Sequence, residues 1–161
     1  VVALHAVTDL VAQHRGQLGP DDITVKRWQA NIADVVRAHT FNPDIDSLIL
    51  DGIPRNVPQA ILMREYIDVL QVFHLSCPDR EELHRRLRKR ALKDNRLDDA
   101  SEAVIARRLA TYEQESKPIL AHYPQEIVTN LDASKPPAEV LLDILNVVTN
   151  LDGWKKHEHH W

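Results

Sequence analysis

The stretch Leu50-Asp-Gly-Ile-Pro-Arg-Asn-Val-Pro-Gln59 decides the fold, because it directly follows a short apolar run, SLIL, at residues 47–50. An apolar run of this length that ends in turn-forming residues is typical of a strand buried in a parallel sheet. A plain turn has no need of a carboxylate at Asp51 and a guanidinium at Arg55. The stretch therefore predicts the end of a core strand that also contributes to a functional site.

Two more apolar runs predict strands, and helical patterns separate them. Strands that alternate with helices favour parallel pairing through right-handed crossovers, so the predicted fold class is α/β, a layered parallel sheet flanked by helices. Asp79 and Glu82 have the spacing of a capping box at the start of one helix. The predicted strands cover residues 47–50, 72–75 and 126–131, and the predicted helices cover residues 1–14, 20–39, 56–69, 79–92, 101–122 and 136–148.

The composition limits the class of protein. A chain of 161 residues is long enough for one domain with a sizeable core. Its net charge of −4 gives no overall attraction to nucleic acid or to an anionic membrane. The single Cys77 excludes an internal disulfide, and no apolar run has membrane-spanning length. The expectation is a soluble, cytoplasmic protein without a membrane or nucleic-acid partner.

Residues 80–96 form a basic segment, with eight Lys or Arg residues against three acids. Such a run is usually a solvated helix face. The predominance of Arg instead favours phosphate binding, and a short polar loop between arginine-bearing helices could close over a polyphosphate. The segment contains no Phe, Tyr or Trp, which argues against single-stranded nucleic acid as the partner.

Ligands of open parallel sheets bind beyond the carboxyl ends of the strands. This rule places residues 51–55, the Cys77–Pro78 turn and residues 132–135 at one edge. There Arg55 could bind a phosphate or a carboxylate, and Asp51 could hold a magnesium ion or its waters. The alternative is that Asp51 caps the following helix and Arg55 pairs with a surface acid.

Residues 50–59 resemble the LDGFPR…Q signature of the adenylate kinase family, which transfers a phosphoryl group from ATP to AMP. Three further segments resemble family motifs in the same order along the chain. Residues 16–21 (GQLGPD) are similar to a G-x-L-V-P-D turn, residues 96–112 to the R-x-DD-N…R-L-x-x-Y run, and residues 132–140 to the final D-x-x-K-P…EV turn. The resemblance covers residues 8–148.

The resemblance implies a three-layer fold like that of the P-loop kinases. Residues 1–150 would form one domain, in which residues 1–40 belong to an AMP-binding subdomain and residues 90–99 form a short lid. Residues 151–161 would be a tail, whose three histidines we interpret as solvated. The short lid resembles the branch of the family that carries no zinc, and the implied cofactor is Mg²⁺ with ATP. The implied partners are ATP and AMP, with the protein acting as a monomer.

The resemblance also implies a role for each matching residue. Arg55 would hold the AMP phosphate and Gln59 would hydrogen-bond the adenine edge, although Gln59 could equally satisfy a local backbone group. Asp51 would orient the waters of magnesium. The other implied AMP-binding residues are Gln17, Leu18, Gly19, Gly52, Ile53, Pro54, Arg96 and Arg108. The implied ATP-binding residues are Arg86, Arg90 and Lys135, and the implied catalytic residues are Arg90, Arg96 and Arg108, with Arg107 as the alternative to Arg108.

One departure from the family pattern leaves two hypotheses open. The family begins with a strand and a phosphate loop, G-x-P-G-x-G-K-G-T, and the four glycines of this chain, at positions 16, 19, 52 and 153, cannot form it. The chain could be an incomplete copy of an adenylate kinase whose intact form catalyses ATP + AMP to 2 ADP. It could instead be a non-catalytic nucleotide-binding or interaction module. On either hypothesis, we expect the chain by itself to be inactive.

Overall fold

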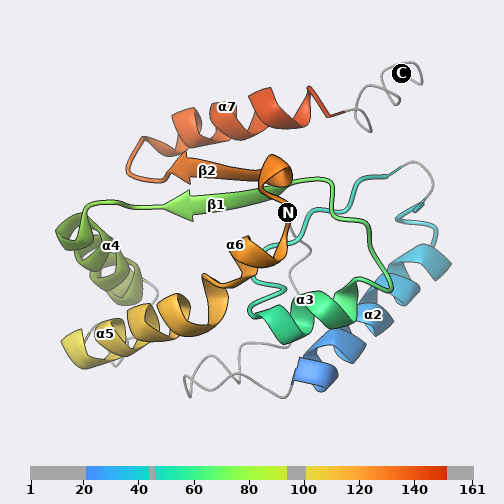
Figure 1. Cartoon of the computed structure of the whole chain (residues 1–161), viewed down its shortest axis with the longest axis horizontal. Coiled ribbons are helices and arrows are strands. Elements are labelled where there is room, and N and C mark those ends of the chain that lie inside the picture. The colour runs from blue at the N-terminus through green and yellow to red at the C-terminus, as the bar shows by residue number, and fades with distance from the viewer. Residues whose placement is uncertain (1–20, 44–45, 94–100, 152–161) are drawn as a thin grey trace. The chain divides into compact units, whose positions relative to one another are not determined.

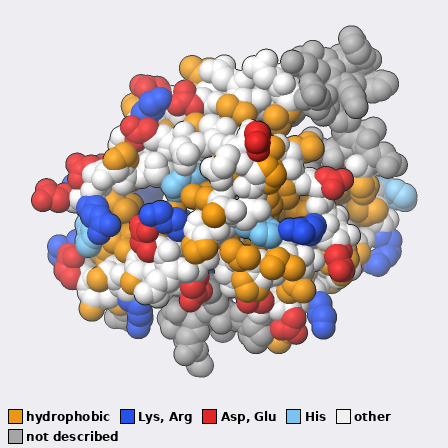
Figure 2. Space-filling view, in the orientation of Figure 1, with side chains coloured by type: hydrophobic (Ala, Val, Ile, Leu, Met, Phe, Trp, Pro, Cys, Tyr) orange, Lys and Arg blue, Asp and Glu red, His pale blue; other side chains and the backbone are white. Residues whose placement is uncertain are grey.

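The computed structural model describes residues 21–43, 46–93 and 101–151 (Figure 1). The chain divides into two compact units, Val1–Leu70 and Gln71–Trp161, and each is described by itself. The predicted helix at residues 1–14, the 16–19 turn, most of the predicted lid with Arg96, and the histidine tail lie outside the described residues. Charged side chains of both signs are spread over the face shown in Figure 2.

The first unit is built on two helices, α2 (Asp21–Arg37) and α3 (Val57–Met63). Two acids in the first turn of α2 and an arginine in its last turn suit the helix dipole. The core of the unit consists of Val25 and Trp28 from α2, Met63 from α3, and Leu50. Leu50 is only 2% exposed, so the end of the apolar run is buried as the sequence predicts.

The predicted strand at residues 47–50 is wrong. The segment has no strand partner among the described residues, and its side chains alternate between the exterior and the core, with Leu50 buried and Ile49 43% exposed. An apolar run can settle in the core without a neighbouring strand to complete a hydrogen-bonded ladder. The predicted helix at 56–69 is also shorter than expected, because α3 ends at Met63, whose carbonyl accepts the turn N–H groups of Tyr66 and Ile67.

The second unit has two parallel strands, β1 (Val72–Ser76) and β2 (Val128–Asp132), in register from Val72 opposite Val128 to Ser76 opposite Asp132. Parallel neighbours need a crossover, and the helices between them supply it. Among the described residues, helices and parallel strands alternate, which confirms the predicted α/β class. The helices are α4 (Arg80–Lys93), α5 (Glu102–Thr111), α6 (Ile119–His122) and α7 (Pro137–Val148), and α7 runs beside β2 in Figure 1.

The predicted helix at 101–122 is interrupted after α5. Residues Tyr112–Ser116 form a π-helical turn, η3, in which the Lys117 N–H donates to the Tyr112 carbonyl at 2.8 Å. Pro118 stands two residues after the end of this turn, and a proline ring collides with the carbonyl four residues earlier in a regular α-helix. The wider turn accommodates that ring.

Two details of the second unit matter for the site. The predicted strand at 126–131 begins later, at Val128, because a short 3₁₀ turn, η4 (Gln125–Ile127), precedes it. The side chain of His74 in β1 links the strands to the crossover: Nδ1 lies 2.7 Å from Asn130 Oδ1, and Nε2 lies 2.5 Å from the Tyr112 hydroxyl.

Within the described residues, no helix is both long and apolar enough to cross a lipid bilayer.

Candidate functional site

In the first unit, the Gly52–Arg55 turn that follows Leu50 has a fixed backbone shape. Gly52 has φ +79°, in the left-handed region that favours glycine, and the Ile53–Pro54 peptide bond is cis. The Arg55 side chain folds back over this turn, because its Nε donates to the Gly52 carbonyl at 2.8 Å. The predicted AMP-binding residues 52–55 are therefore held together as one local unit.

A polar cluster fixes the start of α3 to the start of α2. Asn56 is the N-cap of α3, and its Oδ1 accepts the Gln59 N–H at 2.9 Å. Asp21 Oδ1 accepts a hydrogen bond from each of the Asn56 and Gln59 side-chain amides, at 2.9 and 2.8 Å. Gln59 Oε1 in turn accepts the Arg55 N–H at 2.8 Å. A charge-assisted network of this kind holds the Arg55 backbone in place.

The polar cluster bears on the alternatives that the sequence leaves open for Asp51 and Gln59. The helix cap is Asn56, not Asp51, so Asp51 remains exposed at the end of the apolar run. The Gln59 side chain is 1% exposed, and both ends of its amide are bonded within the protein. In this conformation Gln59 positions Arg55, which agrees with the alternative that Gln59 satisfies a local backbone group. The predicted contact of Gln59 with adenine would require these hydrogen bonds to change.

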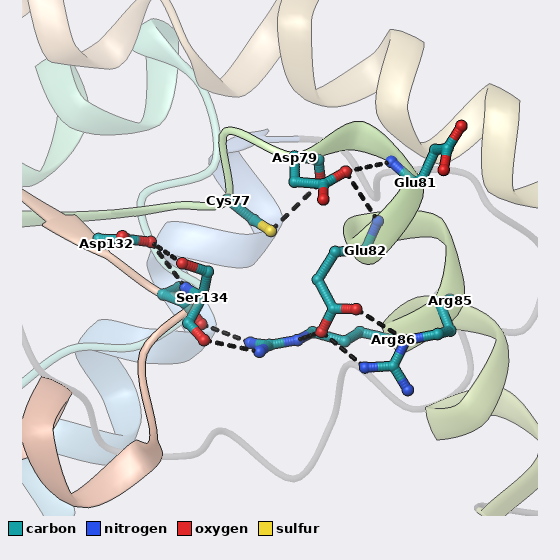
Figure 3. A network of polar contacts seen from close by, with 9 residues as sticks. Cys77, Asp79, Glu81, Glu82, Arg85, Arg86, Asp132 and Ser134 are labelled. Carbon is teal, nitrogen blue, oxygen red and sulfur yellow. Dashed lines mark hydrogen bonds and ion pairs between the residues drawn. The ribbon is translucent and has the colours of Figure 1, made fainter.

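In the second unit, polar side chains gather where β1 and β2 end (Figure 3). Asp79 caps α4, since its Oδ1 accepts the N–H groups of Glu81 and Glu82 at 2.9 and 3.1 Å. This confirms the first half of the predicted capping box. The second half is absent, because the Glu82 carboxylate accepts hydrogen bonds from Arg85 and Arg86 instead.

Glu82 is held in its ionised form. Hydrogen bonds first from Arg85 and then from Arg86 lower the pKa of Glu82 to about 2. The same contact raises the pKa of Arg85 above its ordinary value. Glu82 thus neutralises part of the positive charge of α4 and orients the two arginines in different directions.

Arg86 connects α4 to the turn that follows β2. Its two terminal nitrogens donate to the carbonyls of Ala133 and, at 2.9 Å, of Ser134, while its Nε donates to Glu82. All three guanidinium nitrogens therefore have protein partners. The turn is further fixed by Asp132, whose Oδ1 accepts both the N–H and the hydroxyl of Ser134, and these bonds lower the pKa of Asp132.

The remaining predicted site residues fall into three groups. The turn stabilised by Arg86 carries Lys135, whose Nζ pairs with Asp143 of α7 at 2.7 Å, and this pairing raises the pKa of Lys135. Arg90 is exposed near the end of α4, and Arg108 is half-buried in α5. The residues that lie outside the described part of the chain are Gln17, Leu18, Gly19 and Arg96.

The structure therefore brings together Arg86 and Lys135, the predicted ATP-binding residues, at one edge of the second unit, and residues 52–55, predicted to bind AMP, in the first. Sequence reasoning missed the residues that position them: Asp21, Asn56 and, as an acceptor for arginine, Glu82. The available signal was spacing, because Asn56 stands three residues before Gln59, as an N-cap does before its N3 partner.

The described residues include no group of three or more His, Cys, Asp or Glu side chains that could hold a metal ion. Asp51 thus lies outside any such cluster. A lone exposed carboxylate fits Mg²⁺ only as a partner for its waters, because Mg²⁺ bound with a nucleotide keeps several waters and takes its other ligands from phosphate.

Parallel strands joined through helices, with the side chains of Arg86 and Lys135 beyond their carboxyl ends, define an α/β protein. No protein-family model matches the chain. Individual proteins do: it is 31% identical over 147 residues to an adenylate kinase of Cyanothece sp., covering 87% of this chain and 70% of that protein. The chain belongs to the adenylate kinase family.

Two other relatives agree. An adenylate kinase of Thermobifida fusca is 36% identical over 132 residues, which are 78% of this chain and 65% of that protein. Human adenylate kinase isoenzyme 5 is 30% identical over 138 residues, which are 84% of this chain and 23% of that protein. The chain thus spans only part of the relatives that it matches.

Proposed function

We propose that this chain forms the nucleotide-binding part of an adenylate kinase that, in its complete form, converts ATP and AMP to two ADP with Mg²⁺. The observation that supports this most strongly is the 31% identity over 147 residues to a protein named adenylate kinase. A monomeric, cytoplasmic enzyme of the short-lid, zinc-free type is part of the same proposal.

The first unit supplies the AMP side in this proposal. Arg55 offers a guanidinium at a turn whose shape is fixed by Gly52 and by the Asn56–Gln59–Asp21 cluster. A guanidinium matches a phosphate in shape and charge and keeps its charge at every physiological pH. Asp51, exposed beside it, would meet the waters of the magnesium ion.

The second unit supplies the ATP side. Arg86 already donates to protein oxygens through every nitrogen, so its role in the proposal is to fix the turn that carries Lys135. Arg90 lies one helical turn further along α4, and with Arg96 and Arg108 it would neutralise the phosphates being exchanged. Phosphoryl transfer requires mainly positioning and charge neutralisation, which arginines provide.

The alternative function is a non-catalytic nucleotide-binding module. It is favoured by one observation: the 161 residues contain no phosphate-loop motif. We therefore expect the chain by itself not to sustain the reaction, since no loop of amide donors with a lysine surrounds the β- and γ-phosphates.

A coupled assay on the complete protein separates the two functions. Arg96→Lys and Arg108→Lys each keep the charge but lose the bidentate fork, so kcat should fall by roughly two to three orders of magnitude while KM changes far less. The control is Arg37→Lys, an exposed residue whose guanidinium pairs with Asp34. If both active-site variants keep the kcat of the control, these arginines do not act in phosphoryl transfer.

A further inference from the structure

The basic segment of α4 has two cationic sides, and the proposed kinase site uses only one of them. At 100° per residue, Arg86 and Arg90 share one side of the helix. Arg85, Arg88 and Lys89 lie on another, roughly a third of a turn away. The structure shows where the first side points, because it directs Arg86 to the turn after β2.

The second side faces a hollow of about 430 Å³ between α4 and the first turn of α5. The described residues that line it are His84, Arg85, Arg88, Lys89, Leu92 and Glu102. Of the three permanent positive charges, that of Arg85 is paired with Glu82, which leaves Arg88 and Lys89 beside the single carboxylate of Glu102. The volume lies within the range of small-molecule sites, roughly 300–1,000 Å³. Figure 2 shows Lys and Arg side chains on the α4 side of the molecule, at the left of the view.

Arg85 is neutralised by Glu82, but Arg88 and Lys89 are only weakly neutralised by the protein. Glu102 is 72% exposed on its side chain, 4.0 Å from Arg88 Nη1 and 3.5 Å from His84 Nδ1. Those distances exceed a good charge-assisted hydrogen bond of about 2.7–2.9 Å. Arg85 is paired with Glu82 on the side of the helix toward Arg86. Lys89 has no ion pair with any residue that the structure describes.

We propose that the α4–α5 hollow is a second anion site, separate from the kinase site, that binds a small molecule carrying several linked phosphates. Arg88 and Lys89 would be its principal donors. Arg85 would stay paired with Glu82, and Glu102 would be displaced from its long contacts when the anion enters. Leu92 contributes apolar surface, and the described lining residues include no Phe, Tyr or Trp on which a base would stack, so phosphate groups rather than a base would be recognised.

The probe for this site is inorganic tripolyphosphate, titrated calorimetrically into the chain at 150 mM salt. We expect saturable binding of one equivalent, weakened about tenfold in the double variant Arg88→Gln/Lys89→Gln, on the scale of two partly exposed charge contacts. Lys89→Gln alone should weaken binding without loss of fold, because the side chain has no described ion pair to lose. Glu102→Gln should tighten binding about two- to fivefold, because it removes the opposing carboxylate.

The matched control is Lys26→Gln/Arg27→Gln, which removes two adjacent charges from the exposed side of α2. Equal weakening in the control and in the α4 variant would overturn the site, because it would mean unspecific attraction. Binding lost in Arg86→Gln but retained in Arg88→Gln/Lys89→Gln would also overturn it, by placing the anion at the kinase site. Titration with ATP distinguishes the source: affinity equal to tripolyphosphate indicates that the phosphate tail of a nucleotide suffices, and binding of tripolyphosphate alone indicates a free oligophosphate.

Discussion

Gln59 and Arg55 lie four residues apart in one motif, yet the structure gives them different tasks. The Gln59 amide is buried and bonded to the Arg55 backbone and to Asp21, so it holds the turn. Arg55 is half-buried, with its guanidinium folded over Gly52. A resemblance between sequences assigns both residues to the ligand, because it cannot tell a ligand contact from the bond that positions one.

The first prediction separates these tasks. Gln59→Ala should lower the free energy of unfolding by about 1–3 kcal/mol, because it leaves the Arg55 N–H and the Asp21 carboxylate without their buried partner. Arg55→Ala should instead weaken AMP binding by about 1.5–3 kcal/mol, the scale of a charged hydrogen bond. Denaturant unfolding and calorimetric titration with AMP measure the two quantities.

The control for the unfolding measurement is Gln29→Ala, an exposed glutamine on α2. It should change stability by no more than a few tenths of a kcal/mol. A Gln59→Ala protein as stable as this control would contradict the positioning role. An Arg55→Ala protein with unchanged AMP affinity would return Arg55 to the reading of a surface ion pair.

At the scale of elements, the sequence predicts best where the signal is local. The start of α4 follows from the Asp79 cap, and α7 begins within a residue of its prediction. The segment 47–50 is mispredicted as a strand, because strand pairing depends on a partner that lies far away in the sequence. The π-turn at Tyr112 was also missed, although Pro118 marks the place where a regular helix cannot continue.

Helix α4 should respond to acid through Glu82. Its folded-state pKa of about 2 lies below its ordinary value of 4.5, so the stabilisation is fully present above about pH 4.5 and is lost as the pH falls toward 2. Glu82→Gln should therefore destabilise the chain at pH 7 and have little effect near pH 2. Thermal unfolding across this range measures the difference.

The matched control is Glu81→Gln, the exposed neighbour of Glu82 in the first turn of α4. Glu81→Gln removes the same negative charge from the first turn of α4, but it breaks no hydrogen bond to Arg85 or Arg86. If both variants lose the same stability with the same pH dependence, the dipole and not the arginine contact is responsible.

The contact between Tyr112, at the end of α5, and His74 of β1 can be tested in the same way. Tyr112→Phe removes the hydroxyl that lies 2.5 Å from His74 Nε2 and keeps the ring, so it should cost about 0.5–1.5 kcal/mol. Burial raises the pKa of Tyr112, so its hydroxyl stays protonated and able to donate at neutral pH. Tyr66→Phe, at a tyrosine 48% exposed, is the control, and equal unfolding midpoints for the two variants would show that the bond contributes nothing.

At the scale of the whole molecule, the family and the α/β class could be predicted because several motifs stand in order along the chain. The roles of Arg55, Arg86 and Lys135 in the candidate site stay predictions, drawn from the matching motifs. The bonds that support the site were not predicted, because Asp21 meets Gln59 across 38 positions and Arg86 meets Ala133 across 47. Such contacts form only on folding, and sequence spacing does not predict them.

The central claim is that this chain binds two adenine nucleotides as part of a kinase, and amide hydrogen exchange of the complete protein with a bisubstrate analogue tests it most directly. The analogue joins two adenosines through a chain of phosphates. The account predicts slower exchange at residues 51–59, at 132–135 and across 90–108, because the proposed function assigns a nucleotide contact to each of these segments. Equal exchange with and without the analogue, in a protein shown to be folded, would contradict the account.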